Sequence, residues 1–265
     1  LQHRYAACMT MTDTWFGKLI SKLKELNLYE ETLIILTTDH GHLLGEHGFT
    51  GKNFMHGYNQ LSNIPLMIRY PGGERKGERL TDFTQMIDLP VTLLDYFTCE
   101  IPQTMLGTSI LPVITKKKAG MKDSVLYGWF GGAINICDGQ YTYFRAAVRE
   151  DNTPLYNYCS MPTTLLKFLA MNDRDSIEMG RFLPYTDFPV YKIPAPFPIG
   201  HFKSNKYVRE SLLFDYVNDP EQRHPIDNPE IEARMAEKLQ DLMQWAGAPD
   251  EQYERVGLKK PETGR

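Results

Sequence analysis

A strand that ends in an acid and a histidine constrains this chain most strongly. Residues 32–38 form a run of apolar and β-branched residues, and Asp39, His40 and Gly41 follow directly. Apolar residues on both faces are typical of a parallel strand that helices cover on both sides. Carboxylate and imidazole groups are good ligands for a divalent cation, and strand ends aim side chains into a crevice. The pattern therefore predicts a metal site at the end of this strand.

The charge and the hydropathy exclude two classes of protein. The 265 residues carry a formal net charge of -4, without the basic excess of most nucleic-acid-binding proteins. Because no apolar stretch approaches the ~18 residues that span a bilayer, we expect a soluble protein with no membrane span. The chain begins at Leu1 without the shape of a signal peptide, and we expect it to be a piece of a larger protein. A targeting region would then lie outside it, and the compartment is unknown.

The cysteines are widely spaced and predict no disulfide framework. Cys8, Cys99, Cys137 and Cys159 form no C-x-x-C pair. Free cysteine is among the most buried residue types. We therefore expect buried free thiols.

Residues 1–120 show the alternation of predicted helices and strands that is typical of an α/β domain. A helical pattern covers residues 5–28, and strands are predicted over 32–38 and 64–70. Asp88 is predicted as the N-cap of a helix that runs through Tyr96, with Pro90 in its first turn. The alternation of helix and strand predicts a layered α/β fold.

Residues 121–265 predict a smaller antiparallel subdomain. Asp138-Gly139 is a hairpin-turn signal between two short strands. Pro184, Pro189, Pro194, Pro196 and Pro198 argue against long regular elements in residues 150–207, so we expect that segment to be irregular. The predicted strands cover 124–130, 133–137, 141–147 and 211–216, and a final amphipathic helix covers 229–245.

Short motifs in a fixed order cover most of the chain outside residues 150–207. They are Arg4-Tyr5-Ala6-Ala7-Cys8, Thr38-Asp39-His40-Gly41, Leu44-Gly45-Glu46-His47-Gly48, Gly51-Lys52, Asn63-Ile64-Pro65-Leu66-Met67-Ile68, Asp88-Leu89-Pro90-Val91-Thr92-Leu93-Leu94, Gly107-Thr108-Ser109-Ile110-Leu111-Pro112, Leu213-Phe214-Asp215 and Asn218-Asp219-Pro220. Each motif alone is weak, but their order is specific. Together they resemble the C-terminal half of a sulfatase of the alkaline-phosphatase superfamily. The resemblance implies part of a parallel-sheet sandwich with a small C-terminal antiparallel sheet.

The resemblance also implies a metal-dependent sulfuric-ester hydrolase. In that family a divalent metal binds the sulfate oxygens, and Asp39 and His40 match two of its ligands. Calcium is the commoner sulfatase metal and prefers oxygen ligands. Because His40 stands where many members have asparagine, manganese, magnesium or zinc is also admitted, as is a phosphodiester or phosphonate substrate.

Two further residues are candidates for catalysis. Lys52 matches the family lysine that contacts the sulfate and its bridging oxygen, where a point charge would stabilise the leaving group. His56 lies four residues further on and is predicted either to donate a proton to the substrate or to pack passively.

Parts of the family's active site have no counterpart in this chain. The nucleophile is a cysteine or serine in C/S-x-P-S-R, oxidised to formylglycine, and none of the four cysteines lies in such a motif. The family's N-terminal Asp-Asp metal pair is also missing. We therefore expect both to lie upstream, and we expect this chain alone to be inactive, to bind metal weakly and to need its partner half or self-association.

Two other functions stay open at this point. One is a phosphonate or phosphodiester hydrolase of the same superfamily. The other is a non-catalytic binding or assembly module that kept the fold. The expected ligand is a small-molecule or sugar sulfate ester, and residues 150–207 are expected to shape its recognition.

Overall fold

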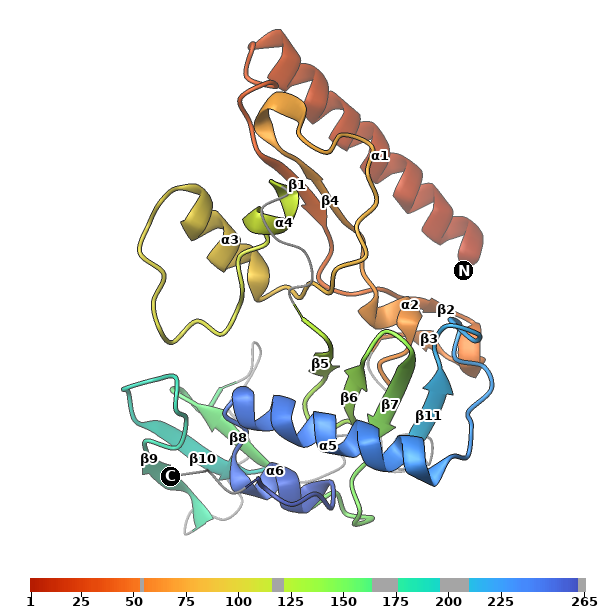
Figure 1. Cartoon of the computed structure of the whole chain (residues 1–265), viewed down its shortest axis with the longest axis vertical. Helices are drawn as coiled ribbons and strands as arrows, with labels where there is room; N and C mark the ends of the chain where they lie inside the picture. The colour runs from red at the N-terminus through yellow and green to blue at the C-terminus, as the bar shows by residue number, and fades with distance from the viewer. Residues whose placement is uncertain (53–54, 116–121, 164–175, 196–209, 262–265) are drawn as a thin grey trace.

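The computed structural model describes residues 1–52, 55–115, 122–163, 176–195 and 210–261. Most of the N-terminal elements form one end of the molecule, and a second group of sheets and helices forms the other (Figure 1). The first group comprises α1 (Gln2–Glu25), β1 (Ile34–Thr37), β2 (Leu43–Leu44), η1 (Glu46–Gly48), β3 (Thr50–Gly51), α2 (Asn59–Ser62), β4 (Leu66–Arg69), η2 (Pro71–Gly73), α3 (Asp88–Tyr96) and α4 (Leu111–Ile114). The second comprises β5 (Val125–Gly128), β6 (Ile134–Cys137), β7 (Tyr141–Arg145), β8 (Tyr156–Cys159), β9 (Glu178–Gly180), β10 (Val190–Pro194), β11 (Leu212–Asp215), α5 (Pro229–Trp245) and α6 (Asp250–Arg255).

The strand that leads to Asp39 pairs in the opposite direction from the one predicted. β1 and β4 form an antiparallel ladder in which Ile34 lies opposite Arg69 and Thr37 lies opposite Leu66. The expectation of a parallel strand is wrong for this pair. An apolar run reports burial on both faces, but it carries no information about the direction of the neighbouring strand.

Only part of the apolar surface of helix α1 is buried against the rest of the described chain. Phe16, Ile20 and Leu23 are half-buried, and the other residues of α1 are exposed. Beside them runs a second apolar stripe, in which Trp15 is 63% and Leu19 53% exposed. In Figure 1, α1 lies along the outer edge of the molecule beside β1 and β4. We define the α1 stripe as Cys8, Met11, Trp15, Leu19 and Leu26, which helical spacing places on one side.

A four-stranded antiparallel sheet is the centre of the C-terminal part. Its order is β11-β7-β6-β5, which confirms the predicted meander and adds β11 at its edge. Helix α5 packs on this sheet, and Tyr143, Met235 and Leu239 are fully buried between them. Asn228 caps α5 by accepting a hydrogen bond from the Ile231 N–H at 3.1 Å. The core of this part lies between the sheet and α5.

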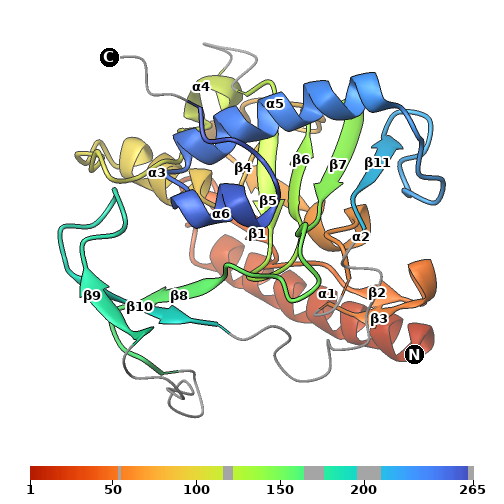
Figure 2. The ribbon, with the colours of Figure 1, turned by 90° about the horizontal axis from the view of Figure 1, so that it is seen from below.

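The described part of residues 150–207 is more regular than expected. It forms a three-stranded antiparallel sheet in the order β8-β10-β9. Prolines are tolerated at strand ends, and Pro194 is the last residue of β10. Figures 1 and 2 both place this sheet on the opposite side of the molecule from the β2–β3 hairpin. Residues 164–175 and 196–209 lie outside the described part.

Two local predictions need correction. Ile87, rather than Asp88, occupies the N-cap of α3. Asp88 is instead fully buried, accepting a hydrogen bond from the Thr108 N–H at 2.8 Å and pairing with Lys122 at 2.7 Å. A buried partner that is distant in sequence outcompetes the local cap.

All four cysteines are free thiols, as predicted, but their burial differs. Cys137 is buried, whereas Cys8 and Cys99 are exposed. Cys8 is exposed because it belongs to the uncovered α1 stripe. Among the described residues, none of the helices is both long and apolar enough to cross a membrane.

Candidate functional site

The structure brings Asp39, His40 and Lys52 together. His40 Nε2 lies 3.2 Å from Asp39 Oδ2. Lys52 Nζ contacts the same imidazole nitrogen. Three of the four site residues predicted from the sequence therefore form one cluster just beyond the end of β1.

A small hairpin returns Lys52 to the end of β1. Leu43 pairs with Gly51 and Leu44 pairs with Thr50, so β2 and β3 reverse the chain over a few residues. The turn needs backbone conformations that glycine adopts without strain, and Gly45 has a φ of 129°. The Glu46 carboxylate accepts a hydrogen bond from the Leu44 N–H, and this contact lowers the pKa of Glu46. The glycines that make this turn were readable from the sequence, whereas the contact that it creates was not.

The ring of His40 is held in one tautomer by its own neighbour. His40 Nδ1 lies 2.8 Å from the carbonyl oxygen of Gly41. Because a carbonyl oxygen only accepts hydrogen bonds, Nδ1 carries the proton in this contact. In the neutral ring, Nε2 then has a free lone pair that faces Asp39 and Lys52. Such a nitrogen can bind a metal ion or accept a hydrogen bond from an ammonium group.

Asp39 is an exposed, ionised carboxylate. Its side chain is 80% exposed, and its Oδ1 accepts hydrogen bonds from the His40 N–H at 3.0 Å and the Thr38 hydroxyl at 3.3 Å. Desolvation pushes the pKa of Asp39 upward, but the attraction of the His40 ring in its protonated form and these hydrogen bonds outweigh it and lower the pKa below its usual value. The carboxylate is therefore negative at neutral pH and open to a ligand.

The donor set fits half of a divalent-metal shell. Asp39 supplies carboxylate oxygen and His40 supplies imidazole nitrogen, which together suit several divalent cations. In the part of the chain that the structure describes, no group of three or more His, Cys, Asp or Glu residues could hold a metal ion. Since two ligands bind a divalent ion weakly, tight binding requires further ligands beyond these two.

His56 lies in the core. It is 1% exposed, and its ring stacks on Phe144 with 5.2 Å between the ring centroids and meets Tyr58 edge-on at 6.0 Å. The Trp129 indole N–H donates to the backbone oxygen of the preceding Met55 at 2.9 Å. This placement favours the packing alternative for His56 over contact with a substrate.

A cleft elsewhere in the structure has both of its lysines paired with carboxylates. It has a volume of about 630 Å³ and contains none of Asp39, His40, Lys52 and His56. Two of its lysines are bound to buried carboxylates, Lys122 to Asp88 and Lys238 to Asp138. We therefore take the cluster at the end of β1 as the candidate site. The cleft is lined by Thr81, Asp82, Phe83, Lys122, Asp123, Asp138 and Lys238.

Sequence comparisons identify the family. Residues 45–164 match the family described as N-sulphoglucosamine sulphohydrolase, C-terminal. The chain is 31% identical over 129 residues to an N-acetylglucosamine-6-O-sulfatase of Bacteroides thetaiotaomicron, covering 48% of this chain and 23% of that protein. It is 33% identical over 229 residues to arylsulfatase K of Xenopus laevis, covering 81% of this chain and 42% of that protein. The chain belongs to the sulfatase family of the alkaline-phosphatase superfamily. It corresponds to the C-terminal part of a sulfatase and spans less than half the length of either relative.

Solved structures confirm the sulfatase fold. One, determined in complex with its substrate D-glucosamine-2-N,6-O-disulfate, aligns with a TM-score of 0.54 and 19% identity over 86% of this chain and 36% of that chain. A phosphonate monoester hydrolase of Silicibacter pomeroyi aligns with a TM-score of 0.58 and 21% identity over 88% of this chain and 39% of that chain. These likenesses confirm the predicted fold class, an α/β sandwich part with a small antiparallel subdomain, although β1 and β4 pair antiparallel within it.

Proposed function

We propose that this chain is the C-terminal part of a metal-dependent sulfuric-ester hydrolase. The observation that carries the proposal is the convergence of Asp39, His40 and Lys52 at the end of β1. Two ligands and one cation at a strand end can hold an anionic ester, but they include no nucleophile. The chain alone is therefore proposed to be inactive, and the hydrolase is the complete protein.

Asp39 and His40 are proposed to supply two ligands of a divalent metal. The support is their mutual distance of 3.2 Å, the exposure of the carboxylate and the fixed tautomer of His40. The metal would supply positive charge to the oxygens of the bound ester. Calcium is the first candidate because the family commonly uses it. The His40 nitrogen also admits manganese, magnesium or zinc.

Lys52 is proposed to bind the anionic ester and to stabilise the oxygen that leaves. Its ammonium group lies beside His40, so a group bound by the metal ligands would also meet a positive charge. His56 is kept as a second catalytic prediction, a proton donor to the substrate. Its burial makes this assignment weaker than that of Lys52.

The remaining parts of the site are proposed to lie in the N-terminal half of the same protein. These parts are the formylglycine nucleophile and the other metal ligands. The exposed α1 stripe is proposed as the surface that this half covers, because an uncovered row of large apolar side chains is unfavourable in water. Self-association through the same stripe is the alternative for the chain in isolation. Residues 1–120 would be the C-terminal part of the catalytic α/β domain, and 121–265 the subdomain.

The substrate is proposed to be a sulfate ester of a sugar or another small molecule. A related fold holds a sulfated sugar, which supports a ligand of this kind. His40 favours one second candidate, hydrolysis of phosphonate or phosphodiester bonds, and a phosphonate monoester hydrolase shares the fold.

One experiment separates these functions. The full reading frame that encodes this chain should contain an upstream C/S-x-P-S-R. Its product should turn over an aryl sulfate faster than the matched phosphonate and phosphodiester. Preference for the phosphorus esters would favour the second candidate. Absence of the motif together with absence of turnover would favour a non-catalytic module.

A further inference from the structure

The segment after His40 lies directly against the backbone of α2. The Gly41 N–H donates to the Leu61 carbonyl at 2.9 Å, and a Cβ atom at Gly41 would lie 1.8 Å from the Gln60 carbonyl oxygen. Such an approach leaves no room for a side chain, so the position of α2 fixes the Gly41 peptide. Gly41 also carries the carbonyl that accepts from His40 Nδ1. One residue therefore connects α2 to the imidazole ring.

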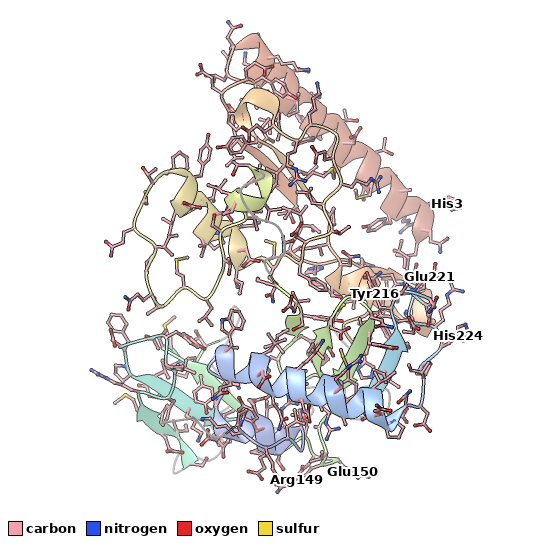
Figure 3. The ribbon with its side chains drawn as sticks, viewed as in Figure 1. His3, Arg149, Glu150, Tyr216, Glu221 and His224 are labelled. Atoms are coloured by element: carbon pink, nitrogen blue, oxygen red, sulfur yellow. The ribbon has the colours of Figure 1, made fainter. Side chains whose placement is uncertain are left out.

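Helix α2 is a single turn, too short to be stable by itself, and the chain after β11 holds it. Gln222 Oε1 accepts from the Asn59 N–H at 2.7 Å, and the Pro220 carbonyl accepts from Asn59 Nδ2 at 3.0 Å. The Tyr216 hydroxyl donates to Asn59 Oδ1 at 3.2 Å and accepts from Asn63 Nδ2 at 3.3 Å, so it ties the two ends of α2 together. Figure 3 labels Tyr216 just beyond β11, on the side of the sheet toward α2.

Gln222 connects this contact to the central sheet. It is 2% exposed, and its Nε2 donates to the Thr142 hydroxyl on β7 at 2.8 Å. Its own N–H donates to the Asp219 carbonyl at 2.9 Å. The side-chain amide of Gln222 therefore uses both of its ends: the oxygen accepts from Asn59 and the nitrogen donates to Thr142. The identity of residue 222 therefore matters, as well as its size.

We infer that Gln222 is a positioning residue for His40, acting through α2 and Gly41. The inference rests on the proposed function only in taking His40 as a metal ligand. Removing a partner that orients a metal-bound imidazole typically costs about 10–100-fold in metal affinity. Gln222 acts through intervening backbone, so we expect the lower end of this range, about tenfold.

The test measures Mn²⁺ affinity by calorimetry, with the melting temperature beside it, in the product of the full reading frame. The variants are Gln222→Ala, Tyr216→Phe and the control Asn152→Ala. Asn152 is a close match for Gln222 because it is also a buried side-chain amide. It is 3% exposed and has a φ of 58°. It donates to the Gly131 carbonyl at 2.8 Å and accepts from Arg255 at 3.0 Å.

Both alanine variants should lower the melting temperature, because each leaves buried polar groups unpaired. Of the two alanine variants, Gln222→Ala alone should weaken Mn²⁺ binding, by about tenfold. Tyr216→Phe should weaken it less and in the same direction. The inference is overturned if Gln222→Ala binds Mn²⁺ as the wild type does, or if Asn152→Ala weakens binding equally. If Gln222→Ala does not fold, unchanged binding by Tyr216→Phe overturns it.

The outcomes separate this inference from the proposed function. A wild type that binds Mn²⁺ in a Gln222-dependent way but hydrolyses no sulfate ester rejects the function alone. If the complete protein is an active sulfatase and Gln222→Ala leaves its Mn²⁺ affinity unchanged, the inference alone is rejected. A wild type that binds no divalent metal overturns both.

Discussion

Lys52 Nζ contacts His40 Nε2, although the two residues lie 12 positions apart in sequence. The contact exists because β2 and β3 fold the intervening chain into a hairpin. It places the amino group of Lys52 beside the nitrogen that is proposed to bind metal. An anionic ester held there would interact with both groups at once.

Removing the charge of Lys52 should slow catalysis. In the complete protein we expect Lys52→Met to lower kcat/KM on an aryl sulfate by roughly 10²–10³-fold, because a positioned charge stabilises the leaving oxygen mainly in the transition state. Lys260→Met is the control, since Lys260 pairs with Asp250 on the surface and exposed pairs contribute little. Equal activity of Lys52→Met and wild type would remove Lys52 from the mechanism.

His47 should make stability depend on pH. Its ring stacks face to face on Tyr58 with 3.7 Å between centroids, and desolvation lowers its pKa below the usual value of about 6.5. The unfolded chain therefore takes up a proton at a higher pH than the folded one. The contribution of His47 to stability is complete above about pH 6.5 and is lost as the pH falls through that value toward the folded pKa.

His47→Phe keeps an aromatic ring against Tyr58 but cannot titrate. Denaturant unfolding at pH 5 to 8 should show a smaller loss of stability on acidification for this variant than for the wild type. Parallel pH profiles would contradict the assignment.

The α1 stripe should control the behaviour of the isolated chain. We expect the 265-residue chain to self-associate, and Trp15→Lys with Leu19→Lys to reduce that association in sedimentation experiments. In the complete protein the same pair should lower thermal stability, since it would place charges in an apolar contact. Ser21→Lys is the control, because Ser21 is an exposed residue of α1 outside the stripe. A monodisperse isolated chain with cooperative melting would contradict the proposal.

The sequence predicted best those features that depend on neighbouring residues alone. The helix over residues 229–245 follows from the periodicity of its apolar residues, and the structure has the same bounds. Asp39 and His40 were predicted as site residues because they directly follow a strand. The direction of β1, the burial of Asp88 and the role of Gln222 depend on partners far away in sequence, such as β4, Thr108 and Asn59. A single sequence carries no signal for such pairings.

The most direct test of the central claim is metal binding by Asp39. Asp39→Asn keeps the shape and removes the charge; Asp151→Asn is the matched control, because Asp151 is also an exposed carboxylate that accepts hydrogen bonds, from the Thr153 N–H at 3.1 Å and its hydroxyl at 2.8 Å. In the complete protein we predict that Asp39→Asn weakens divalent-metal binding at least about tenfold and abolishes aryl sulfate turnover, while Asp151→Asn changes neither. Wild-type metal affinity and turnover in Asp39→Asn would contradict the account.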